Sequence, residues 1–142
     1  MTARRWITAF AVWTGYCWGT RIKNALGDDT STSVTKAAIV VWSMVLVFGA
    51  LALLVAARST TLPRQRIVDV VLAVTVASWT ASAISMLVGG RGAAFIAVHL
   101  TLAAVSIALG VQAHRSTSSA SVRQRQPPPA FKNSPTEHST TS

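Results

Sequence analysis

The feature that most constrains the fold is an uncharged apolar run at residues 37–57, AAIVVWSMVLVFGALALLVAA. At about 1.5 Å per residue, a helix of this length reaches roughly 31 Å. That length matches the hydrocarbon core of a bilayer, which is about 30 Å thick. A soluble helix of the same length would present a polar face to water, and this run has none. The sequence therefore predicts an integral membrane protein.

Three further apolar segments accompany this run. The predicted spans are residues 5–21, 37–57, 67–88 and 93–111. Thr32 and Ser33 precede the second span as N-cap candidates. Only 12% of the residues are charged, about half the share of a soluble domain. We predict an all-α fold, with a bundle of four transmembrane helices in residues 1–114. A disordered basic tail rich in Ser, Thr and Pro is expected in residues 115–142.

The first span is the shortest. Its apolar part, residues 6–19, would reach only about 21 Å as a helix. However, aromatic side chains stand near both ends, and Arg5 and Arg21 flank the segment. Such residues are typical of membrane interfaces, where long basic side chains extend a span. No small-residue cleavage site follows, as a signal peptide would require. A bundle of three spans, without this segment, is the alternative.

The basic residues indicate the orientation. Four spans place nine basic residues on one side of the membrane and four on the other, whereas three spans give seven against six. The side with nine holds Arg4, Arg5, Arg58, Arg64, Arg66, Arg115, Arg123, Arg125 and Lys132. Basic loops favour the cytoplasmic side. The pattern thus favours four spans with both termini in the cytoplasm. Ten arginines against three lysines suggest a high-GC bacterial gene, and hence a bacterial inner membrane.

A polar patch is predicted on the outward side, after the first span. Arg21, Asn24 and Asp28 are spaced i, i+3 and i+7, so they share a face if the first helix continues beyond the lipid. Such a patch would be available to a ligand or a partner. The commoner explanation is a solvated helix end held by a local ion pair.

Asp69 and His99 are the polar candidates within the spans. An acid in a membrane helix is a candidate functional site, but Asp69 lies in the first turns of its helix, near Arg66. A capping role is expected there. Neutral imidazole can carry a proton or bind a metal, yet no second ligand accompanies His99. We expect His99 to hydrogen-bond a neighbouring helix, far in depth from Asp69.

Small side chains at helical spacing predict where helices pack, because they let helices approach closely and hydrogen-bond across the contact. The predicted packing residues are Ser78, Ser82, Ser85, Ala97, Thr101, Ala104 and Ala108. A second stripe on the last span is formed by His99, Ala103, Ser106 and Gly110. Two such faces suit a central position in the bundle or a surface for self-association.

The sequence offers no recognisable catalytic constellation. The four acids are Asp28, Asp29, Asp69 and Glu137, and no two of them fall within the spans. Cys17 is the only cysteine, so neither an internal disulfide nor a thiolate cluster can form. Phosphate-binding loops, nucleophile elbows and zinc motifs are absent from the sequence. We expect no enzymatic activity, no cofactor and no metal.

One stretch resembles a known group of proteins. The residues Trp18, Gly19, Thr20, Arg21, Ile22, Lys23 and Asn24, followed by Asp28 and Asp29, resemble the end of the first helix in small uncharacterised multi-pass membrane proteins of actinobacteria. The resemblance covers about a tenth of the chain. It implies a fold and a membrane location but no mechanism.

These features favour a non-enzymatic inner-membrane protein that acts as an accessory or self-associating subunit of a membrane complex. The expected partners are the bilayer and other membrane proteins or further copies of the chain, and not nucleic acid. For the basic tail, contact with anionic lipid, docking of a partner or simple solvation stay open. The alternative function is a phage holin-like pore former. A weaker alternative is a small solute or proton-coupled transporter that uses Asp69 and His99.

Overall fold

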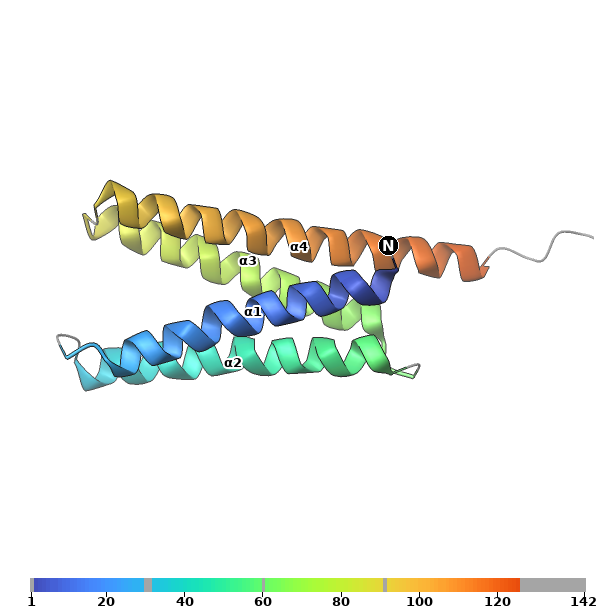
Figure 1. Ribbon diagram of the computed structural model, residues 1–142, viewed down its shortest axis with the longest axis horizontal. Helices are drawn as coiled ribbons and strands as arrows, with labels where there is room; N and C mark the ends of the chain where they lie inside the picture. The colour runs from blue at the N-terminus through green and yellow to red at the C-terminus, as the bar shows by residue number, and fades with distance from the viewer. Residues whose placement is uncertain (1, 30–31, 60, 91, 126–142) are drawn as a thin grey trace, which may run out of the picture.

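The computed structural model describes residues 2–29, 32–59, 61–90 and 92–125, with side chains up to residue 119. Its helices are α1 (Ala3–Leu26), α2 (Ser33–Arg58), α3 (Arg64–Val88) and α4 (Ala93–Arg125). Each helix runs antiparallel to the next, and α1 also packs against α4, which closes the bundle (Figure 1). The predicted all-α bundle is confirmed.

Three of the described helices are long and apolar enough to cross a membrane. They are Ser33–Arg58, Arg64–Val88 and the Ala93–Ser119 part of α4. The outside of the bundle suits lipid, since Val41, Phe48 and Val55 are 65%, 60% and 57% exposed. Helix α1 has 24 residues, which is sufficient length, but its basic ends and its Thr and Trp residues make it less apolar. The number of crossings therefore depends on α1.

Local signals explain where the helices begin and end. The Thr32 side chain accepts a hydrogen bond from the Thr35 backbone N–H at 3.3 Å, which confirms the predicted N-cap of α2. At the other end of α2, Arg64 Nε donates to the carbonyls of Ala56 and Ser59 at 2.9 and 3.0 Å. The last carbonyls of a helix lack partners within it. Arg64 thus caps the C-terminus of α2 and stabilises the turn into α3.

Helix α4 extends well beyond its predicted span. Its last turns contain the hydroxyl residues Ser116, Thr117, Ser118 and Ser119, each of which donates to a helix carbonyl three or four residues earlier. Ala113 and Thr117 are buried, at 0% and 6% exposed, so this polar segment packs against the bundle. The helix therefore passes the boundary at residue 115 that composition suggested. The remainder of the expected tail, residues 126–142, lies outside the described residues.

The bundle interior changes from an apolar core to a layer with hydrogen bonds. Toward the end with the N-terminus, it is apolar and contains Ile7, Phe10, Ala11, Leu53, Ala57, Val68, Val71 and Ala113. Gly110 allows close packing there, because a Cβ at this position would lie 3.2 Å from the Phe10 ring and 2.5 Å from Leu72 Cδ1. The next layer is held by indole–hydroxyl bonds. Trp13 Nε1 donates to Ser106 Oγ across α1 and α4 at 3.0 Å.

Candidate functional site

The main polar site joins α3 and α4 at the end of the bundle that carries the N-terminus. His114 Nδ1 lies 2.7 Å from Asp69 Oδ1, and Gln65 Nε2 lies 3.0 Å from each of these two atoms. We call these three residues the Asp69 cluster. The Asp69 and His114 side chains are 45% and 44% exposed, so the cluster opens to the surface.

Hydrogen-bond chemistry assigns the donors in this cluster. An ionised carboxylate can only accept, so His114 Nδ1 carries a proton and donates it to Asp69, while the Gln65 amide donates to the same oxygen. The arrangement ties α3 to α4. Among the described residues, no group of three His, Cys, Asp or Glu side chains could hold a metal ion.

The cluster corrects the role expected for Asp69. Its described partners are Gln65 and His114, and no described ion pair joins it to Arg66. The sequence did contain the signal, because Gln65 and Asp69 are spaced i, i+4 on one helix face. His114 carries no such signal, because it lies beyond the apolar run of the last span, which ends at residue 111.

His99 lies apart from this cluster. About four turns of α4 separate it from His114, or roughly 22 Å. Its Nδ1 lies 2.9 Å from the Phe95 carbonyl of the same helix, which accepts the bond, and not from a group on a neighbouring helix as expected. The small cavity beside it, about 50 Å³ and lined with Trp79 and Met86, is almost entirely apolar. The structure therefore does not bring Asp69 and His99 together.

The three residues of the predicted outward patch differ in their surroundings. Arg21 turns toward the interior, where its Nη1 donates to Ser82 Oγ on α3 at 3.2 Å and its guanidinium lies 5.1 Å from the centroid of the Trp18 ring. Asn24 is exposed, and Asp28 lies beyond the end of α1 at Leu26. Arg21 thus acts as a link between α1 and α3.

The predicted packing residues occupy two different environments. Ser78 and Ser82 are in the interior, at 4% and 7% exposed. Ser78 Oγ accepts a bond from Trp42 Nε1 of α2 at 3.0 Å. The remaining residues are exposed on the outside of the bundle: Ser85 on α3, and Ala97, Thr101, Ala104 and Ala108 on α4.

Comparisons with protein-family models, with curated proteins and with solved structures found no match to the chain. The functional argument therefore rests on the residues of the chain itself. These describe a four-helix bundle, three of whose helices are long and apolar enough to cross a membrane, with the Asp69 cluster at the end that carries the N-terminus.

Proposed function

We propose that the chain is a non-enzymatic subunit of a bacterial inner-membrane assembly. It associates through α4 with a second copy of itself or with another membrane protein. In this proposal α1 crosses the bilayer with the other three helices, and both termini lie in the cytoplasm. The observation that carries the proposal is the position of α4 in the bundle.

Helix α4 has the most surface left for a partner. Its apolar window is 11% buried, against 22% for α2 and 33% for α3. Its exposed face carries the stripe of small residues Ala97, Thr101, Ala104 and Ala108, while Ser106 and Gly110 of its other stripe are buried. Small side chains let a second membrane helix approach closely. This outer face is thus suited to helix association.

The packing of α1 supports a fourth crossing. Ile7, Phe10, Thr14 and Trp18 of this helix are buried, and it lies along both α2 and α4 (Figure 1). A helix packed between two others that cross the bilayer shares their depth. Interfacial Trp and Arg residues can offset its lower hydropathy.

Substitution of Ala104 tests the association. We expect Ala104→Leu to weaken self-association of the purified protein about tenfold, measured by cross-linking over a dilution series, since blocking close helix contact costs about 1.4 kcal/mol or more. Ala52→Leu, at an exposed alanine of α2, is the matched control and should leave cross-linking unchanged. Equal cross-linking in both variants would contradict a role for this face of α4.

Purification in mild detergent, followed by cross-linking and mass spectrometry, identifies the partner. A second protein recovered at a fixed ratio to the chain would make the chain an accessory subunit. Recovery of the chain only with further copies of itself would make it a self-associating subunit. Large assemblies of mixed size that release a dye from vesicles would favour the holin-like alternative. Uptake of a solute that Asp69→Asn and His99→Gln abolish would favour the transporter. A monomer without partners would contradict the proposal.

A further inference from the structure

An open groove of about 690 Å³ lies between the first turns of α1 and the last turns of α2. Arg4, Arg5 and Arg58 line its polar part, and we call this the arginine groove. Small-molecule sites have volumes of about 300–1,000 Å³. We propose that this groove binds one anionic phospholipid, with the headgroup phosphate on the arginines and an acyl chain along the adjoining apolar wall.

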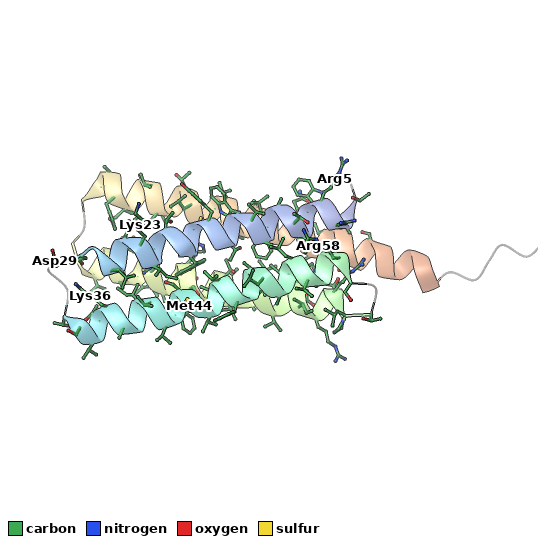
Figure 2. All side chains as sticks on the ribbon, turned by 60° about the horizontal axis from the view of Figure 1, so that its bottom comes forward. Arg5, Lys23, Asp29, Lys36, Met44 and Arg58 are labelled. Atoms are coloured by element: carbon green, nitrogen blue, oxygen red, sulfur yellow. The ribbon has the colours of Figure 1, made fainter. Side chains whose placement is uncertain are left out.

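The groove concentrates positive charge that no acid of the described chain neutralises. The described ion pairs join Asp29 to Lys36 and Asp69 to His114, and neither involves a groove arginine. The first turn of α1 contains no acid. Figure 2 shows Arg5 and Arg58 at the same end of the bundle, opposite the end with Asp29 and Lys36. Guanidinium groups bind phosphate through paired hydrogen bonds.

Arg58 is not needed to cap the C-terminus of its own helix. A basic residue in the last turn of a helix commonly bonds the terminal carbonyls. In this protein Arg64 makes those bonds, to the carbonyls of Ala56 and Ser59. Arg58 is exposed and lines the groove. Its guanidinium is therefore available to a ligand.

The remaining lining selects a lipid over a soluble anion. Ala9, Val12 and Leu54 form the wall on the membrane side of the arginines, and Val12 is 59% exposed. A free phosphate would use only the arginines, whereas an acyl chain would cover this wall as well. Basic pockets between membrane helices on the cytoplasmic side suit anionic headgroups. The inference rests on membrane insertion and not on association through α4, so either one can fail alone.

Native mass spectrometry of the purified full chain tests the site. Each arginine near an anionic headgroup contributes about fivefold, so we expect Arg4→Gln with Arg58→Gln to weaken phosphatidylglycerol retention about 25-fold. Arg66→Gln with Arg115→Gln removes the same charge from exposed positions outside the groove. Screened charges of this kind should change retention by about twofold at most.

Three further results show whether the ligand is a lipid or free phosphate, and how specific the groove is for it. Phosphatidylcholine should be retained weakly by the wild-type chain, and inorganic phosphate at equal concentration should not raise its melting temperature. Arg4→Lys with Arg58→Lys keeps the charge and should retain the lipid several-fold less well, because the paired bonds are lost. Equal losses in the two glutamine variants, or stabilisation by phosphate alone, would overturn the proposal.

Discussion

Replacing Gly110 by leucine is expected to lower the free energy of unfolding by about 3 kcal/mol, near the upper end of the usual cost of overpacking. A Cβ at this position would already lie 2.5 Å from Leu72 Cδ1 and 3.2 Å from the Phe10 ring. Further methyl groups would have to separate α4 from both α1 and α3. The measurement is unfolding in mixed detergent micelles, followed by the loss of helical circular dichroism.

Gly19→Leu is the matched control for this prediction. Gly19 is also inside a helix, but nothing lies within 4 Å of a Cβ built on it. Both substitutions gain the same helix propensity, about 1 kcal/mol relative to glycine. We expect the Gly19 variant to be as stable as the wild type or more stable. Similar losses at both positions would mean that α4 does not approach α1 as closely as described.

A second prediction concerns the Asp69 cluster. A double-mutant cycle with Asp69→Asn and His114→Gln should give a coupling energy of about 1 kcal/mol. A charge-assisted hydrogen bond is stronger than a neutral one, but both side chains are nearly half exposed, and water weakens the contact. The free energy of unfolding of the four proteins at one pH provides the measurement.

His99 supplies the control on the same helix. Its described hydrogen bond goes to Phe95, within α4, so its cycle with Asp69 should give no coupling beyond about 0.3–0.5 kcal/mol. If Asp69 couples to His99 as strongly as to His114, the separation of the two sites is incorrect. Such a result would favour the transporter, which needs communication between Asp69 and His99.

The positions of the helices can be predicted from the sequence because each helix depends on a local signal. The apolar runs gave the helix positions, and Thr32 gave the start of α2. The end of α4 cannot be predicted in this way. Its Ser-rich last turns look like a tail in composition, and they are helical because Ala113 and Thr117 pack against the bundle. Tertiary contact overrides composition there.

The polar sites depend on pairing between distant segments, which one sequence does not reveal. Asp69 has a local partner in Gln65, but its contact with His114 arises only because α3 and α4 lie side by side. The same holds for Arg21, whose spacing suggested an outward face and whose guanidinium instead reaches Ser82 of α3. Spacing shows which residues share a helix face, but it does not show which way that face points.

Labelling of single cysteines tests the central claim, that α1 crosses the membrane together with its neighbour α2, most directly. In a Cys17→Ser background, Thr2→Cys, Leu26→Cys and Thr61→Cys place one thiol at successive helix ends, all at exposed positions. A membrane-impermeant maleimide is applied to right-side-out and to inverted vesicles. We predict that positions 2 and 61 react from the cytoplasmic side and position 26 from the opposite side. Reaction of positions 2 and 26 from the same side would contradict the account, because α1 would then not cross the bilayer.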